Sequence, residues 1–166
     1  PYTMKLEGSG PVGFPTVSMV GIRARKGMQD PRRWVEAVSA AGIDKLEKAG
    51  VPRDSYDFWL RPYGYNGVSG MPVPEGYVPN ELLMMLTVTA ETQEKATQIT
   101  KAFNPLLLHH NIFEGKQMPS YGFLFSPAEM ERGAIYEFKL TRCPSTTRSS
   151  WCASTMMKSE KSEEEI

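Results

Sequence analysis

The 166-residue chain carries 19 lysine and arginine residues against 19 aspartate and glutamate residues, so its formal net charge is zero. This balance excludes a strongly basic nucleic-acid-binding protein and provides no general attraction to an anionic membrane. The length suits one domain with a core of ordinary size. No apolar run approaches the roughly 18 residues of a membrane span, and the N-terminal residues lack the pattern of a secretory signal. The only two cysteines, Cys143 and Cys152, favour a reducing cytoplasm over a disulfide scaffold.

The first half of the chain predicts a strand, a helix and a second strand. The strand covers residues 16–24, a β-branched and apolar run that follows a segment rich in proline and glycine. Asp30 is a good helix N-cap, and Pro31 fits the first helical position, where its missing N–H costs nothing. Gly42 is expected to end or bend this helix, and Gly50 with Pro52 to end any continuation. Residues 56–63 are aromatic and alternating, which predicts the second strand.

The second half begins with a long connection, residues 64–80, that is rich in glycine and proline. Long ordered loops of this kind are often functional. Residues 82–90 form a nearly continuous apolar run, which predicts a central strand that is covered on both faces. Thr92 starts a second helix, and Asn104 with Pro105 is expected to interrupt it.

Residues 121–125 predict a fourth strand and residues 134–140 a further strand at an edge. The resulting order of strand, helix, strand, strand, helix, strand is that of a ferredoxin-like α+β fold. In this fold two helices cover one face of an antiparallel sheet. The other face is then expected to be covered by a partner or by another domain.

The histidines and the glycine-rich loop are two candidate sites. His109 and His110, the only histidines, either cap or pack structurally or supply a proton acceptor. No metal site is expected, because neither HxxxH spacing nor a nearby cysteine is present. The glycine-rich segment 63–71, with Tyr65, Asn66 and Gly67, is either a tight turn or a place where the backbone approaches an anion or acyl ligand. It matches no P-loop and no GxGxxG motif, so no cofactor is expected.

A third candidate is the basic cluster that follows the first strand. Arg23 begins it, with further basic residues at positions 25, 26, 32 and 33. Such a cluster is either a solvated loop or a carboxylate or phosphate site near a helix N-terminus. No nucleophile, base and orienting group can be assembled from the chain, so catalysis by this chain alone is disfavoured.

RNA binding is also disfavoured. The segment SYGFLFSP resembles the aromatic motif of RNA-recognition domains, but here it falls on the fourth strand, whereas the base-stacking motif of those domains lies on the third. The first strand carries no stacking aromatic side chain, and the net charge is zero.

Several segments in series resemble the C-terminal region of the acyclic terpene utilisation (AtuA-like) family. They are MKLEGSGPVGFPTVSMVGIR, YGYNGVSG, ELLMMLTVTAETQEKATQI, LLLHH and FLFSPAEMERGAIYEF, and they cover roughly residues 4 to 140. The resemblance implies a smaller ferredoxin-like domain that follows a large N-terminal domain in a bacterial cytoplasmic protein. It also implies a link to operons that degrade citronellol and geraniol through acyl-CoA intermediates. It transfers no catalytic residue, and the loop ARKGMQ departs from the family's pattern, in which GIR runs directly into Asp-Pro.

Residues 1–142 are therefore expected to form one domain, interpreted as a piece of a longer chain, and residues 143–166 a disordered or loosely packed tail. The tail reads as a frameshifted terminus, a hypothesis that sequencing of the source DNA tests. Two functions remain open. One is an accessory domain that docks its open sheet face on a larger AtuA-type domain or on a second copy. The other is an acyl or carboxylate half-site built from the 63–71 loop, Arg23 and His110.

Overall fold

An antiparallel sheet and two helices form the part of the chain that the computed structural model describes, residues 3–23, 30–110 and 121–144. The fold class is therefore α+β, as predicted. The helices and strands are β1 (Thr3–Ile22), α2 (Pro31–Lys48), the 3-10 turn η1 (Arg53–Ser55), β2 (Tyr56–Tyr63), β3 (Leu82–Ala90), α3 (Gln93–His109), β4 (Tyr121–Phe123), β5 (Met130–Glu131) and β6 (Ile135–Pro144).

The six strands form one open sheet in which four lie in the order β2-β3-β1-β4, while β5 and β6 also pair with β1. The pairs β2–β3, β1–β3, β1–β4 and β1–β5 are all antiparallel. Thr87 of β3 defines the register, since it lies opposite Trp59 of β2 on one side and Val17 of β1 on the other. Strand β3, whose sequence is the most apolar, is thus central, as its composition predicts.

The chain contacts divide the molecule into two compact units. Residues Val12–Ile135 form the larger unit, which holds both helices and the strand order given above. The described residues outside it, 3–11 and 136–144, belong to the smaller unit, where β1 pairs with β6. All sites discussed below lie within one unit or the other.

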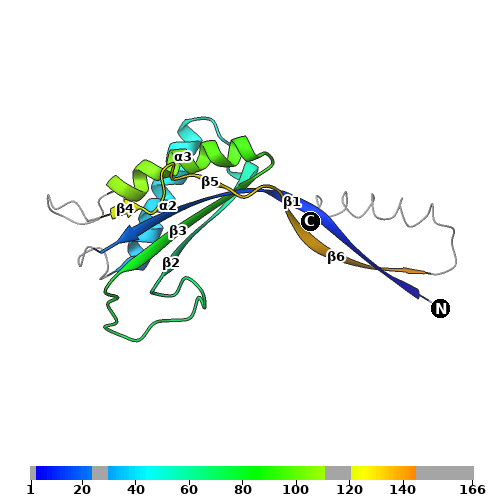
Figure 1. Cartoon of the computed structure of the whole chain (residues 1–166), viewed down its shortest axis with the longest axis horizontal. Helices are drawn as coiled ribbons and strands as arrows, with labels where there is room; N and C mark the ends of the chain where they lie inside the picture. The colour runs from blue at the N-terminus through cyan, green and yellow to red at the C-terminus, as the bar shows by residue number, and fades with distance from the viewer. Residues whose placement is uncertain (1–2, 24–29, 111–120, 145–166) are drawn as a thin grey trace. The chain divides into compact units, whose positions relative to one another are not determined.

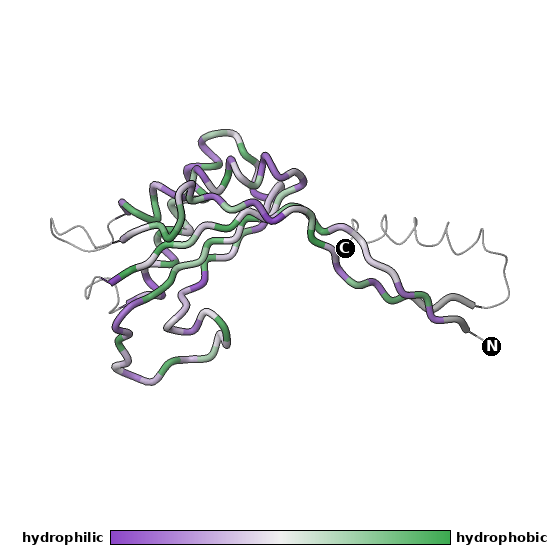
Figure 2. Tube along the Cα trace, in the orientation of Figure 1, coloured by the Kyte–Doolittle hydropathy of each residue, from purple (hydrophilic) through white to green (hydrophobic). Residues whose placement is uncertain are grey.

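The core of the larger unit lies between the sheet and its two helices (Figure 1). Along β3 every second side chain is buried, from Leu82 to Ala90, and the side chains between them are half-buried. This period of two is what a strand requires when one face is packed and the other is not. Figure 2 shows hydrophobic residues along the paired strands and on the helices that cover them.

Helix α2 begins as the sequence predicts, passes through Gly42 and ends at Lys48, just before the predicted stop at Gly50 and Pro52. The N–H of Arg33 donates a hydrogen bond to Asp30 Oδ1 over 3.0 Å, and Pro31 occupies the first turn. The prediction that Gly42 ends the helix is wrong, because the helix continues to Lys48. Gly42 instead lies directly against the ring of Phe103 on α3, where a Cβ atom would overlap the ring. The glycine allows close helix packing rather than a turn.

Helix α3 also continues past its expected break. Its N-cap is Thr92, whose Oγ1 accepts a hydrogen bond from the N–H of Lys95 over 3.2 Å. The prediction that Asn104 and Pro105 interrupt the helix is wrong, since both lie inside Gln93–His109. An internal proline costs a helix about 3 kcal/mol. Burial of Phe103 before it and Leu107 after it offsets this cost.

Strand β1 is much longer than the predicted 16–24, because its glycine- and proline-rich start pairs with β6. A partner more than a hundred residues away supplies these hydrogen bonds, and local sequence patterns do not report it. The predicted fifth strand, 134–140, corresponds to β6. The polar loop 25–29 lies outside the described residues, as does the predicted tail 143–166 apart from Cys143 and Pro144.

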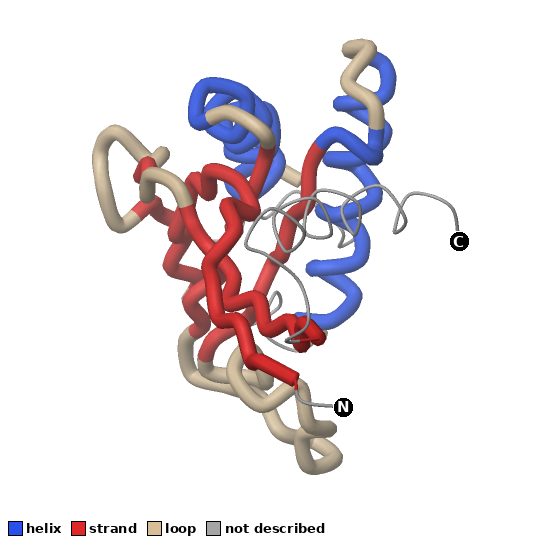
Figure 3. Tube along the Cα trace, turned by 90° about the vertical axis from the view of Figure 1, so that its right-hand side faces the viewer, coloured by secondary structure: helices blue, strands red, loops and turns tan. Residues whose placement is uncertain are grey.

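The connection between β2 and β3 extends beyond the ends of the strands (Figures 1 and 3). It folds onto itself at its start, where the N–H groups of Tyr65 and Gly67 both donate to the carbonyl oxygen of Pro62. The hydroxyl group of Tyr77 donates to the carbonyl oxygen of Gly64 over 3.1 Å. These bonds give the segment a defined turn structure.

Candidate functional site

The sheet face that the helices do not cover is the first candidate surface. Its side chains alternate with the buried ones on each strand, and in the larger unit we call it the open face. Asp57, Arg61, Thr87 and Thr89 lie on this face, and its apolar side chains are Val17, Met19, Trp59, Tyr63, Leu83, Met85 and Leu124. Trp59 is 61% exposed and Leu124 49% exposed, and the other apolar side chains are half-buried. Adjacent apolar side chains on an uncovered sheet are typical of a surface that meets a partner.

Strand β2 adds charge to the open face. Asp57, Trp59 and Arg61 alternate along it and are all exposed. The guanidinium carbon of Arg61 lies 5.3 Å from the centre of the Trp59 ring, within the range of a cation–π contact. The aromatic ring therefore lies between a negative and a positive side chain on an outer strand of the sheet.

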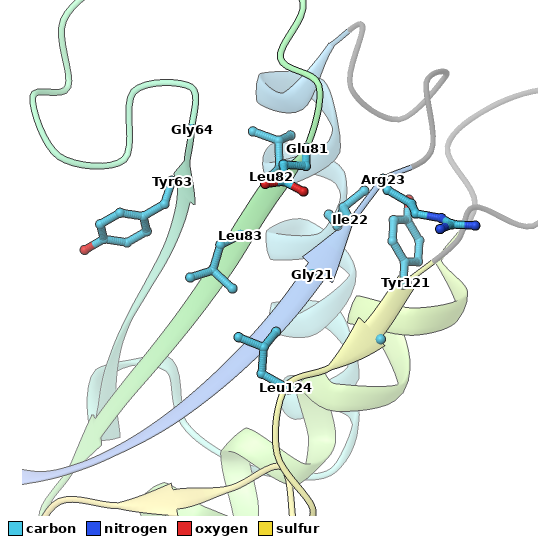
Figure 4. Close-up of a pocket in the computed structure, with 11 residues that line it drawn as sticks. Gly21, Ile22, Arg23, Tyr63, Gly64, Glu81, Leu82, Leu83, Tyr121 and Leu124 are labelled. Atoms are coloured by element: carbon cyan, nitrogen blue, oxygen red, sulfur yellow. The ribbon is translucent and has the colours of Figure 1, made fainter.

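A depression of about 660 Å³ occupies one end of the open face. Its described lining includes Arg23 after β1, Tyr63 and Gly64 at the end of β2, and Leu83 on β3. Figure 4 shows Tyr63, Leu83 and Leu124 in front of the sheet, with the helices behind it. Arg23 supplies a guanidinium group that can bind a carboxylate above apolar side chains, but Glu81 also lines the depression and adds a negative charge.

The predicted loop residues lie close to this depression along the chain, but they are not among its described lining residues. Tyr65, Asn66 and Gly67 form the turn that follows β2. Tyr65 packs partly against the core, and its ring centre lies 6.2 Å from that of Tyr77. A Cβ atom on Gly67 would come 2.8 Å from the carbonyl carbon of Pro62. The absence of a side chain at Gly67 thus allows the backbone of the turn to pass close to the backbone of Pro62.

The two histidines lie at the C-terminal end of α3. His109 is the last residue of the helix and is exposed, whereas His110 follows it and is half-buried. The N–H of His110 donates to the carbonyl oxygen of Leu106 over 3.0 Å, which closes the last turn. Neither histidine is among the described residues that line the depression with Arg23.

Within the described ranges, no group of three or more histidine, cysteine, aspartate or glutamate side chains is arranged to hold a metal ion. No helix in the same ranges is long and apolar enough to cross a membrane.

One tyrosine at the depression is buried more deeply than its position suggests. Tyr121 lines the depression, but its ring packs against Trp34 with ring centres 5.9 Å apart. The Tyr121 hydroxyl group and the indole nitrogen of Trp34 are both buried without a well-formed hydrogen bond in the described structure. Burial raises the pKa of Tyr121 from 10.0 to about 12, and the nearby indole N–H lowers this pKa slightly.

This shift predicts a stability change at alkaline pH. The folded state keeps the Tyr121 proton to a higher pH than the unfolded state does, so the stabilisation is complete below pH 10.0 and is lost as pH rises toward about 12. Denaturant unfolding measured across this range should show a steeper loss of stability for the natural chain than for Tyr121→Phe. The difference between the two profiles removes the parallel effect of Tyr56, whose pKa burial also raises. Profiles that run parallel would contradict the assignment.

Comparisons of the chain with protein-family models, with curated proteins and with solved structures found no match. The geometry of the site therefore carries the functional conclusion.

Sequence reasoning missed a second exposed apolar surface, which lies in the smaller unit. Tyr136, Phe138 and Leu140 of β6 are 65%, 68% and 54% exposed. They lie two residues apart and so point to one face of the strand, while Glu137 and Lys139 point to the other and form an ion pair of 3.4 Å. The alternation in AIYEFKL is the signal from which this stripe could have been found.

Proposed function

We propose that this chain is an accessory interaction domain that docks its open face on a larger protein domain. The partner inferred from the sequence resemblance is the large N-terminal domain of an AtuA-like protein, which links the chain to acyclic terpene catabolism in the cytoplasm. The observation that carries the proposal is the apolar character of the open face. Met19, Leu83 and Met85 form an apolar cluster on it, next to Arg61 of β2 and beside the depression.

The strand order supports a ferredoxin-like arrangement for this domain. Four antiparallel strands in the order β2-β3-β1-β4, with one helix after β1 and one after β3, are what a split βαβ unit produces. Such a layer leaves one sheet face without helices. The fold by itself assigns no activity, so the chemistry of the open face decides the function.

The size of the apolar area also supports docking. Side chains from β1, β2, β3 and the residue after β4 contribute to the open face, so it spans the whole width of the four-strand sheet. Contiguous apolar patches larger than a few hundred Å² are rare on monomeric proteins, and they mark interaction sites. Each of the half-buried methionine side chains adapts readily to a partner's surface.

Co-elution with the larger domain tests the proposal. The reading frame upstream of the gene should encode that domain, and the two proteins should co-elute when produced together. Leu83→Lys should weaken co-elution at least tenfold, because it places a charge within the apolar cluster of the open face. The matched control is Lys101→Leu on α3, which alters one exposed side chain away from the open face. Absence of such a reading frame, or equal co-elution of both variants, would refute docking through this face.

The depression favours a second candidate, an acyl or carboxylate half-site. Arg23 and Glu81 are exposed among its lining residues, and Leu83 and Leu124 supply apolar surface. Such a half-site would be completed by the docked domain rather than by this chain alone, since Tyr65, Asn66 and the two histidines are not among its described lining residues. Docking therefore remains the conclusion for this chain.

A further inference from the structure

We propose that two copies of this chain pair edge to edge along β2, antiparallel, with Trp59 of each copy on the twofold axis. The pairing would join two four-strand sheets into one continuous layer and would leave the central part of each open face free. It goes beyond the docking function and does not depend on it. The occupant of the edge is a second copy, because the charge pattern of β2 is complementary to itself.

The hydrogen-bonding direction of β2 follows from that of β1. The carbonyl oxygens of Pro15 and Met19 accept hydrogen bonds from the N–H groups of Arg132 and Leu124. The main-chain N–H and C=O groups of the odd-numbered residues of β1 are therefore directed away from β3. Main-chain groups alternate in direction along a strand. By the register, the even-numbered residues of β3 form hydrogen bonds with β1, and its odd-numbered residues form them with the odd-numbered residues of β2. The main-chain N–H and C=O groups of the even-numbered residues of β2 are therefore directed to the free edge.

Both ends of this edge are already blocked. The carbonyl oxygen of Tyr56 accepts a hydrogen bond from Arg53 Nη1 over 2.8 Å. Pro62 has no N–H, and its carbonyl oxygen accepts from two N–H groups of the following turn. Among the described residues of this edge, only the main-chain groups in the middle of β2 remain available to pair with another strand. They are the N–H and C=O groups of Phe58 and Leu60, and natural edges are often shortened in this way.

Antiparallel pairing of β2 with its copy can use all of these free groups. When Phe58 of one copy lies opposite Leu60 of the other, each pair exchanges two hydrogen bonds, and the twofold symmetry makes four. The two Trp59 side chains then lie side by side on the open face. The residues flanking the hydrogen-bonded pairs lie opposite one another at the shorter cross-strand spacing.

The charges select this register. With Trp59 on the axis, Asp57 of each copy lies opposite Arg61 of the other, so two identical ion pairs flank the aromatic pair. A shift of the register by two residues would place Asp57 opposite an uncharged residue instead. Opposite charges in direct cross-strand pairs stabilise a sheet, and like charges destabilise it. The arrangement is isologous, as a closed dimer requires.

A mixing experiment with the full chain tests the proposal. Sedimentation velocity should give a dimer for the natural chain at high protein concentration. Asp57→Arg should weaken dimerisation at least tenfold because it places two arginine side chains in each contact, and Arg61→Asp should do the same with two aspartates. An equimolar mixture of these two variants should form a heterodimer, since it restores both ion pairs, and high salt should weaken this heterodimer. Lys101→Glu is the control, an exposed charge reversal on α3 that should leave dimerisation unchanged.

Each result decides for or against the pairing. A natural chain that remains monomeric at every concentration overturns it. Single variants that dimerise like the natural chain, or a mixture that stays monomeric while both variants are folded by circular dichroism, overturn the register. Loss of docking in Leu83→Lys with an intact β2 dimer would separate this pairing from the docking function.

Discussion

Gly42→Val should lower the free energy of unfolding by about 2 to 3 kcal/mol, because a side chain at this position overlaps the Phe103 ring and the two helices must separate to admit it. Phe103 is fully buried and also packs against Phe58 of β2, with ring centres 5.0 Å apart. Movement of this ring therefore disturbs the helix pair and the sheet together. Urea unfolding monitored by circular dichroism measures the effect.

The control for this prediction is Ala40→Val, on the same helix but exposed. It carries only the lower helix propensity of valine, a cost below about 0.7 kcal/mol. In a second test, Phe103→Leu introduced together with Gly42→Val should recover part of the loss, since the smaller side chain leaves room. Neighbouring residues that share a contact show this kind of non-additivity. Purely additive effects would show that the contact with Phe103 is not the cause.

Gln93→Met should lower the free energy of unfolding by about 2 kcal/mol, since it removes three hydrogen bonds, each worth about 1 kcal/mol, at a partly buried position. The amide Nε2 of Gln93 donates to the carbonyl oxygen of Pro15 over 3.2 Å and to Thr16 Oγ1 over 2.7 Å. Its Oε1 accepts from the N–H of Gly133 over 3.0 Å. One side chain at the start of α3 thus joins β1 to the segment after β5.

A local measurement accompanies this second prediction. Hydrogen exchange of the Gly133 amide should become faster in Gln93→Met, because its acceptor is gone. Gln98→Met is the matched control, since that glutamine lies on the same helix, is exposed and makes one hydrogen bond, to Glu94 Oε1. If both variants lose the same stability, the bonds to β1 and Gly133 contribute nothing specific.

The candidate site was only partly predictable from the sequence. An apolar third strand indicated an open face that needs cover, and the structure has alternating Leu83 and Met85 on that face of β3. Arg23 was also found from the basic cluster, because its place directly after a strand fixes it at the end of the sheet. The positions of His109 and His110 relative to the depression were not predictable, since they depend on where α3 ends. That end lies beyond a proline at which the sequence predicts a break.

Local periodicity and capping residues such as Asp30 and Thr92 predicted both helices and four of the strands, but not β5 or the first half of β1. Contacts between distant residues explain why both helices continue through Gly42 and Pro105, and why β1 begins at Thr3. Gly42 and Pro105 are local signals to stop, but contacts with Phe103 and the surrounding core outweigh them. The pairing of β1 with β6 joins segments that no local pattern connects. The free energy gained by packing residues that are distant in the sequence exceeds the backbone preference of any single residue. These contacts exist only in the folded chain.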